Sequence, residues 1–147
     1  YAMGTAVARS SAETEFYRRG TAFRIPGMKV NGMDVLEVHQ AAKHAVAHVR
    51  AGNGPVLMEL NTYRYRGHSM SDPAKYRTRE EVQGVRETSD PIERAKADLL
   101  AMGVDEEKLK DIDKRIRATV TEAADFAESS PLPQPHELYT DVLVETY

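Results

Sequence analysis

His68 stands in the segment of this chain that most favours chemistry. It follows Gly67 within residues 61–73, a polar stretch that has neither helical nor strand periodicity. An imidazole titrates near neutral pH, and a neighbouring glycine lets the backbone approach a ligand closely. Basic side chains gather around it, at Arg64, Arg66, Arg77 and Arg79. The residue types favour a binding or catalytic loop and a solvated basic loop about equally.

Two other arrangements are weaker candidates for a site. His44 and His48 are four residues apart, a spacing that can place two imidazoles on one metal ion, but no carboxylate completes a ligand set. Ser69 adjoins His68, and the two residue types are those of a nucleophile and its base. Sequence neighbours rarely adopt the geometry that such a pair needs, and the chain has no Gly-x-Ser-x-Gly turn. A metal centre and a serine hydrolase are therefore not the preferred interpretations.

Composition excludes several classes of site. The 147 residues include no cysteine, which rules out disulfides, thiolate zinc sites, iron–sulfur clusters and cysteine nucleophiles. With 41% hydrophobic and 29% charged residues, the chain is expected to bury a core. No apolar run approaches the roughly 18 residues of a membrane span, so we expect a soluble protein with no membrane partner.

Charge is distributed unevenly along the chain. The net charge of −3 combines +6 over residues 1–79 with −9 over residues 80–147. The basic part could meet phosphate, and the acidic part could meet a basic partner. Nucleic acid is not an expected partner, because the basic residues are scattered and the pI is about 6.0.

A strand–helix–strand unit is predicted to position the His68 segment. Residues 28–30 form a short strand candidate, and residues 55–60 form an apolar run that is typical of a buried parallel strand. Between them we predict a helix over 35–50, with Asp34 as N-cap and Glu37 as its capping-box partner. Its apolar stripe is expected to face the core; it comprises Val35, Val38, Ala42, Ala45 and Val49. The fold class is therefore α/β, with residues 61–73 beyond the carboxyl end of a strand.

Helices dominate the sequence on either side of this unit. A short polar helix is expected around Glu13–Arg19. Later, Thr78 with Glu81 predicts a capping box, and Asp90 before Pro91 predicts another helix start. Asp105 opens a longer helix with an apolar stripe at Leu109, Ile112, Ile116, Val120, Ala123 and Ala127. Prolines end that pattern, and residues 137–147 show no decisive period.

Residues 63–73 read YRYRGHSMSDP and residues 76–81 read YRTREE. Together they closely resemble the active-site loop of the pyruvate dehydrogenase alpha-subunit family, which are thiamine-diphosphate-dependent 2-oxo acid dehydrogenases. The resemblance covers nearly the whole chain and is strongest over residues 1–95. Further segments match the family in order: YAMGT at 1–5, FYRRG at 16–20, IPG at 25–27, NGMD at 31–34 and GPVLMEL at 54–60.

The chain departs from the family pattern in a few places. The Gly-Asp-Gly motif and following Asn of the family, whose side chains hold the metal, do not occur here, so we expect the carboxyl-terminal portion of the subunit. Ala2 stands where many relatives have Gly. Glu13 replaces one regulated serine, and the short Ala-Lys link between Pro73 and Tyr76 omits another, so only Ser69 remains as a possible regulatory site.

The resemblance implies a domain organisation. Residues 1–88 would form the carboxyl-terminal half of a thiamine-diphosphate-binding, transketolase-like parallel-sheet domain, with an active-site loop at 63–78. Residues 89–147 would form a helical tail and terminal segment. The loop is expected to be mobile without cofactor, because it has few apolar anchors.

The resemblance also implies chemistry and residue roles. The whole subunit would catalyse oxidative decarboxylation of pyruvate and transfer the acetyl group to a lipoyl group, using thiamine diphosphate and magnesium. Tyr1 would bind the cofactor and give its backbone carbonyl to the metal. His68 would bind the cofactor near its reactive end and act in catalysis, assisting proton transfer during acetylation of the lipoyl group. Arg64 and Arg66 would organise the loop.

Partners and alternatives follow from the same resemblance. The expected partners are a beta subunit, in an α2β2 assembly, and the lipoyl domain of dihydrolipoyl acetyltransferase. The expected location is the bacterial cytoplasm or, alternatively, the mitochondrial matrix. An alpha subunit acting on branched-chain 2-oxo acids or acetoin is the nearest alternative enzyme. An inactive assembly fragment is the alternative outside catalysis, since residues 1–147 alone are expected to be inactive.

Overall fold

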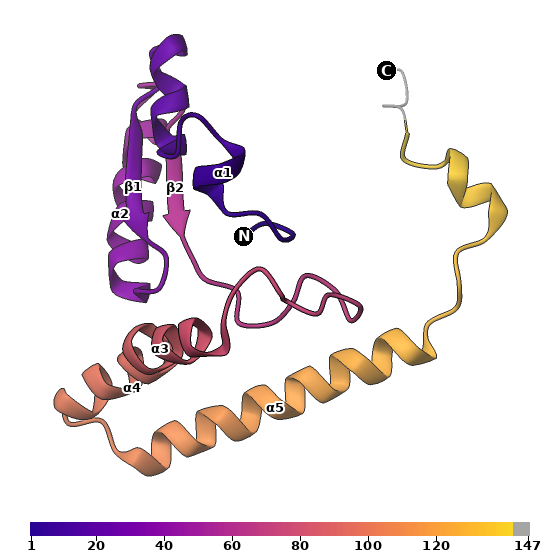
Figure 1. Ribbon diagram of the computed structural model, residues 1–147. Coiled ribbons are helices and arrows are strands. Elements are labelled where there is room, and N and C mark those ends of the chain that lie inside the picture. The colour runs from indigo at the N-terminus through magenta and orange to yellow at the C-terminus, as the bar shows by residue number, and fades with distance from the viewer. Residues whose placement is uncertain (143–147) are drawn as a thin grey trace. The chain divides into compact units, whose positions relative to one another are not determined.

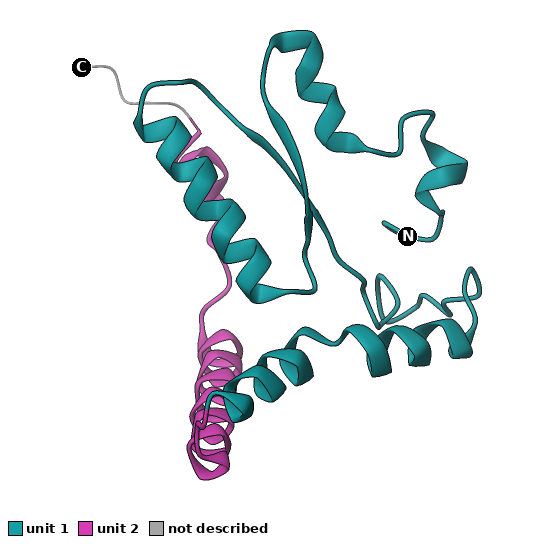
Figure 2. Ribbon diagram, turned by 90° about the vertical axis from the view of Figure 1, so that its left-hand side faces the viewer, with its two compact units in different colours: residues 1–102 teal, residues 103–147 magenta. Residues whose placement is uncertain are grey.

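A computed structural model describes residues 1–142 of the chain (Figure 1). The chain divides into two compact units, residues 1–102 and residues 103–147 (Figure 2). The elements in order are α1 (Val7–Ser10), the 3-10 helix η1 (Phe16–Phe23), β1 (Gly27–Asn31), α2 (Val35–Arg50), β2 (Leu57–Asn61), α3 (Arg79–Ser89), α4 (Pro91–Ala101), α5 (Glu106–Ser129) and the 3-10 helix η2 (Pro135–Tyr139). The predicted division at residues 88 and 89 remains a prediction.

The strand–helix–strand unit is confirmed. β1 pairs with β2 in parallel, with Gly27 opposite Leu57 and Asn31 opposite Asn61. Helix α2 connects them, as a parallel pair requires. Both strands end at the same edge, and the His68 segment leaves from the end of β2 (Figure 1). The mixed helix and strand architecture with a small parallel sheet agrees with the predicted α/β class.

Helix α2 has the predicted bounds because its cap is the predicted one. Oδ1 of Asp34 accepts hydrogen bonds from the backbone N of Leu36 at 2.9 Å and of Glu37 at 3.1 Å. The Glu37 carboxylate does not close a reciprocal box with Asp34. It accepts instead from the backbone N of Asn31 at 2.8 Å and so fixes the end of β1. That half of the predicted capping box is wrong, since the strand end offers the carboxylate a different donor.

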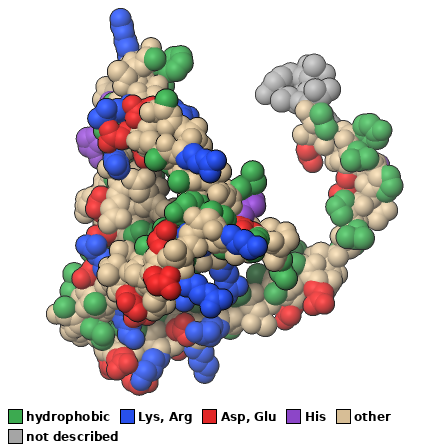
Figure 3. All heavy atoms as spheres, viewed as in Figure 1, with side chains coloured by type: hydrophobic (Ala, Val, Ile, Leu, Met, Phe, Trp, Pro, Cys, Tyr) green, Lys and Arg blue, Asp and Glu red, His purple; other side chains and the backbone are tan. Residues whose placement is uncertain are grey.

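The hydrophobic core of the described residues is small. Val30 on β1 and Ala45 on α2 are its buried hydrophobic side chains, at 3% and 8% exposure. The stripe predicted for α2 is only partly correct, because Val35 and Val49 are exposed at 56% and 51%. Helix α2 has 16 residues and is about 24 Å long, whereas each five-residue strand is about 17 Å long, so the helix is longer than the strands on which it packs. On the face drawn in Figure 3, hydrophobic side chains accordingly lie among charged ones at the surface.

Helix η1 lies close against the sheet. The short helix expected around Glu13–Arg19 is found as a 3-10 helix that begins at Phe16, three residues later. Its close approach explains Gly27, because a Cβ atom at that position would lie 2.1 Å from the carbonyl oxygen of Tyr17. A side chain there would force the helix away from β1.

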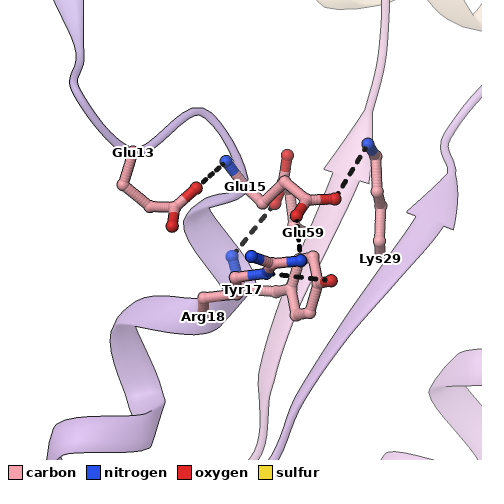
Figure 4. A network of polar contacts seen from close by, with 6 residues as sticks. All are labelled: Glu13, Glu15, Tyr17, Arg18, Lys29 and Glu59. Carbon is pink, nitrogen blue, oxygen red and sulfur yellow. Dashed lines mark hydrogen bonds and ion pairs between the residues drawn. The ribbon is translucent and has the colours of Figure 1, made fainter.

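A polar network ties η1 to both strands (Figure 4). The Glu59 carboxylate on β2 accepts a hydrogen bond from the backbone N of Tyr17 at 3.0 Å. The Glu15 carboxylate pairs with Arg18 and, at 3.7 Å, with Lys29 on β1. These contacts hold η1 over the sheet with little apolar burial.

The second unit is built on α5, which Asp105 caps as predicted by accepting from the backbone N of Glu107 at 3.0 Å. Its predicted apolar stripe is present but exposed, with Ile116 at 59% and Val120 at 63%. Among residues 1–142, no helix has both the length and the apolar character that a membrane span needs. Part of the segment 137–147 lies outside the described residues.

Removing the cap of α2 should destabilise the first unit. We expect Asp34→Ala to lower the free energy of unfolding by about 0.5–2 kcal/mol, the usual effect of losing an N-cap. Denaturant unfolding measures this change. Asp34 also pairs with Arg94 at 2.7 Å. Asp34→Asn is the control: it keeps a capping oxygen but loses the ion pair, and should cost less. Equal losses in both variants would contradict the importance of the cap.

Candidate functional site

Arg77 gathers the backbone at the start of the loop that follows β2. Its guanidinium donates hydrogen bonds to three consecutive carbonyl oxygens, those of Arg64, Tyr65 (2.9 Å) and Arg66 (3.1 Å). The same group lies 5.1 Å from the centre of the Tyr63 ring, a cation–π distance. A segment without secondary structure must satisfy its carbonyl groups by other means, and Arg77 does so here.

Arg64 connects the loop to the first residues of the chain. Its guanidinium donates to the carbonyl oxygen of Ala2 at 2.5 Å, to the hydroxyl of Tyr76 at 2.9 Å and to the carbonyl of Arg66 at 2.7 Å. The Tyr76 ring lies 5.1 Å from the ring of Tyr1. Residues more than sixty positions apart are thereby joined, and the predicted loop-organising role of Arg64 is confirmed.

Asp72 closes the turn that carries His68. Oδ2 accepts from the backbone N of His68 at 2.7 Å and from the Tyr76 hydroxyl at 2.9 Å, while Oδ1 accepts from the backbone N of Ala74 at 2.8 Å. The backbone bonds from His68 and Ala74 lower the pKa of the Asp72 carboxyl below its ordinary value of 3.8. Gly67 fits this turn because a Cβ atom there would lie 2.7 Å from the Asp72 carbonyl oxygen.

His68 and Ser69 form no side-chain hydrogen bond with each other in the described residues, so they do not make a catalytic dyad. Both residues are exposed. The Ser69 hydroxyl lies 3.0 Å from the Ser71 hydroxyl, and within residues 1–142 no hydrogen bond reaches the His68 imidazole. The serine hydrolase interpretation therefore gains no support, and the imidazole is available to an incoming partner.

The two histidines four residues apart, His44 and His48, both lie on α2. Nε2 of His48 lies 3.1 Å from the carbonyl oxygen of Asn53, at the end of the helix. In the part of the chain that the structure describes, no three His, Asp or Glu side chains come close enough to share a metal ion.

A cavity of about 280 Å³ opens between the loop and the first residues. Its walls are formed by Tyr1, Ala2, Thr62, Tyr63, Arg64 and Arg77. Tyr1, predicted as a cofactor ligand, is thus part of a cavity, whereas His68 is not among its lining residues. Two guanidinium groups on the wall suit an anionic group such as a diphosphate.

The same residues do not by themselves suit magnesium. This ion takes near-octahedral oxygen ligands, usually with carboxylate or amide side chains among them. The described residues at the cavity offer hydroxyl and backbone oxygens but no cluster of carboxylates. We therefore do not expect the residues that line the cavity to bind magnesium without further ligands.

Acid should loosen the turn around His68. Because the pKa of Asp72 is lowered in the folded chain, its stabilising contribution is present above about pH 4 and is lost as the pH falls through the lowered value. We expect the backbone NH signal of Ala74, which donates to Oδ1 of Asp72, to be constant from pH 7 to about pH 4 and to shift below it. NMR titration of this amide measures the change. A shift of the Ala74 signal centred near pH 6 would contradict the assignment to Asp72.

Comparison with known proteins connects this geometry to a family. The family model described as "Dehydrogenase E1 component" matches residues 1–136. The chain belongs to the dehydrogenase E1 component family. The first unit of this E1 family member, with its loop and cavity, lies entirely within the matched residues.

Curated relatives of this E1 chain carry consistent names. A protein of Rhizobium meliloti named pyruvate dehydrogenase E1 component subunit alpha is 57% identical over 98% of the chain and 42% of the relative. One of the same name from Zymomonas mobilis is 56% identical over the whole chain and 42% of the relative. A mitochondrial form from Pisum sativum is 48% identical over the whole chain and 37% of the relative. The chain spans about two fifths of the length of such relatives.

Several residues of this E1 site escaped sequence reasoning. Asp72 and Tyr76 hold the loop together with Arg77, but the sequence predicted no role for Asp72 or Tyr76 and placed Arg77 only among the basic side chains near His68. A signal was available: these polar side chains recur in a segment whose backbone groups lack regular partners. Arg66, expected to organise the loop with Arg64, contributes its carbonyl oxygen to the hydrogen bonds described above.

Proposed function

We propose that this chain is part of the alpha subunit of the pyruvate dehydrogenase first component. The reaction is thiamine-diphosphate-dependent oxidative decarboxylation of pyruvate with acetyl transfer to a lipoyl group. The observation that carries the proposal is the Arg64 bridge, through which the loop bearing His68 is bound to the segment that begins at Tyr1. The two residues expected to meet the cofactor thus belong to one hydrogen-bonded unit, within a family whose curated relatives carry this name.

Residues around the cavity have distinct proposed roles. Thiamine diphosphate, when bound, supplies the carbanion chemistry of the reaction, and the protein supplies positioning and electrostatics. Tyr1 would contribute a backbone carbonyl to magnesium, whose remaining ligands would have to be groups other than those described at the cavity. Positive charge from Arg64 and Arg77 on the cavity wall favours the diphosphate.

His68 is the proposed catalytic residue. Its imidazole is exposed at the surface of a turn whose backbone is fixed by Asp72. A group with accessible neutral and charged forms near pH 7 can donate a proton and recover it. We assign this proton transfer to acetylation of the lipoyl group, for which the imidazole must be reachable from outside.

Ser69 is proposed as a regulatory site. Its hydroxyl is exposed and lies against the hydroxyl of Ser71, inside the turn closed by Asp72. Phosphorylation would add about two negative charges to a turn held by a carboxylate, and the repulsion would loosen it.

The proposed assembly is an α2β2 heterotetramer that also meets the lipoyl domain of dihydrolipoyl acetyltransferase. The curated relatives include bacterial and mitochondrial proteins. Our proposal for the location is correspondingly the bacterial cytoplasm or the mitochondrial matrix.

A comparison of three substrates tests this function. The α2β2 assembly containing this chain should be assayed with pyruvate, 2-oxoisovalerate and acetoin. We expect the highest kcat/KM with pyruvate. Preference for 2-oxoisovalerate or acetoin would replace the pyruvate assignment by one of the related dehydrogenases, and inactivity of a correctly assembled enzyme with all three would overturn the catalytic assignment.

Residues 1–147 alone should bind the cofactor weakly. The described residues offer no carboxylate cluster for magnesium, and a backbone carbonyl cannot replace such ligands. We expect calorimetry with thiamine diphosphate and magnesium to give no binding at micromolar concentrations. Micromolar binding by residues 1–147 would show that the chain contains metal ligands that the proposal places outside it.

A further inference from the structure

Glu81 lies in the first turn of α3 but does not use its carboxylate there. Thr78 caps this helix, because its hydroxyl accepts a hydrogen bond from the backbone N of Glu81 at 3.1 Å. The predicted capping box requires the Glu81 side chain to return to the backbone N of Thr78. That reciprocal bond is not formed within the described residues, so the second half of this prediction is wrong. The carboxylate has a different set of partners.

Two tyrosines from distant parts of the sequence share the Glu81 carboxylate. The hydroxyl of Tyr63 donates to Oε1 at 2.8 Å, and the hydroxyl of Tyr1 donates to Oε2 at 3.2 Å. Tyr63 stands at the root of the loop, and Tyr1 is 80 positions away from Glu81 in sequence. All three residues are half-buried, and both tyrosines line the cavity described above. One carboxylate on a helix therefore holds two tyrosines that line that cavity.

We propose that Glu81 is a positioning residue that sets the backbone of Tyr1 relative to the loop root. The consequence for cofactor binding rests on the proposed function, because only there does the Tyr1 segment meet a cofactor. Arg64 holds the same segment through the Ala2 carbonyl. Glu81 and Arg64 together restrain Tyr1 through its side chain and through the adjacent backbone. A single hydrogen bond would leave the segment free to rotate, whereas two from different elements define its orientation.

Electrostatics favour this arrangement at physiological pH. Burial and then the Glu81 hydrogen bond raise the pKa of the Tyr63 hydroxyl, and burial and then the Glu81 charge raise the pKa of the Tyr1 hydroxyl. The Arg77 guanidinium acts against both shifts. Both phenols therefore stay protonated at physiological pH and remain donors to the carboxylate.

Matched substitutions in the α2β2 assembly test the role of Glu81. Glu81→Gln offers one acceptor oxygen in place of two, and Glu81→Ala offers none. We expect Glu81→Ala to raise the Kd for thiamine diphosphate at fixed magnesium by about tenfold or more, as loss of hydrogen bonds to a charged group implies. Glu81→Gln should fall between Glu81→Ala and the wild type. Glu80→Gln is the control, since it changes charge equally in the same helical turn.

Hydrogen exchange in the cofactor-free assembly provides a second readout. We expect Glu81→Ala to speed exchange at residues 1–4 and 63–66, with Glu80→Gln unchanged. Wild-type exchange in both segments and wild-type cofactor affinity in Glu81→Ala would overturn the proposal. If the wild-type assembly binds no thiamine diphosphate, the proposed function fails, and the exchange comparison alone then decides whether Glu81 positions Tyr1.

Discussion

Arg77→Lys is expected to lower the acetyl-transfer activity of the proposed α2β2 assembly by about 100-fold, because small displacements of a catalytic loop have effects of this size. The guanidinium bonds to three consecutive carbonyl groups and faces the Tyr63 ring. An ammonium group cannot reach these groups in the same planar geometry. The carbonyls of residues 64–66 would lose partners, and the loop that carries His68 would lose its fixed path.

Arg79→Lys is the matched control for this change. Arg79 is exposed at the start of α3, and its substitution removes a guanidinium of the same charge two residues away. Steady-state kinetics with the complete complex measure both variants, and circular dichroism verifies that the assembly is folded. Activity of Arg77→Lys within about twofold of that of Arg79→Lys would show that carbonyl binding by Arg77 does not order the loop.

The helix starts could be predicted because their signals are local. Asp34, Asp90 and Asp105 cap the helices that sequence assigns to them, each accepting from backbone N–H groups two or three residues ahead. Such bonds depend on a few neighbouring residues and little else. The hydrogen-bond partners of the Glu37 and Glu81 carboxylates could not be predicted. The donor to Glu37 is a backbone N at the end of a strand, and the donors to Glu81 are hydroxyls of tyrosines distant in sequence.

Burial was harder to predict than helix position. The spacing of apolar residues places Ala45 correctly in the core but cannot show how much of the helix the strands cover. In the described residues β1 pairs with β2 alone, and Val35 and Val49, at the two ends of α2, stay exposed. Parallel sheets in α/β proteins are usually covered on both faces, so exposed apolar residues on α2 are consistent with a chain that spans two fifths of its relatives.

The polar contacts within the loop could not be predicted for a related reason. Few apolar anchors in residues 63–78 suggested a segment that moves freely without cofactor. The structure places polar anchors there instead, through Arg64, Asp72 and Arg77. A hydrogen bond between residues 62 positions apart has no local sequence signature, so only the resemblance to a family indicated that these residues act together. Mobility of the loop without cofactor stays a prediction.

His68→Ala should separate the two halves of the proposed reaction. We expect the activity of the complete complex to fall by about 10²–10⁴-fold, the range for loss of a general acid or base. Decarboxylation measured with an artificial electron acceptor should fall much less, because the proposed proton transfer belongs to acetylation of the lipoyl group. Single-turnover acetylation of a free lipoyl domain measures that half directly.

Ser69→Ala is the control for His68→Ala, because it alters the neighbouring side chain of the same exposed turn while the Asp72 bond to the backbone N of His68 can still form. If His68 is a solvated residue with no catalytic role, both variants should show the same small change in both assays. A general loss of loop order predicts that both assays fall together in His68→Ala. Only proton transfer by the imidazole predicts a selective loss of lipoyl acetylation, and wild-type acetylation by His68→Ala in an intact assembly would remove His68 from the catalytic residues.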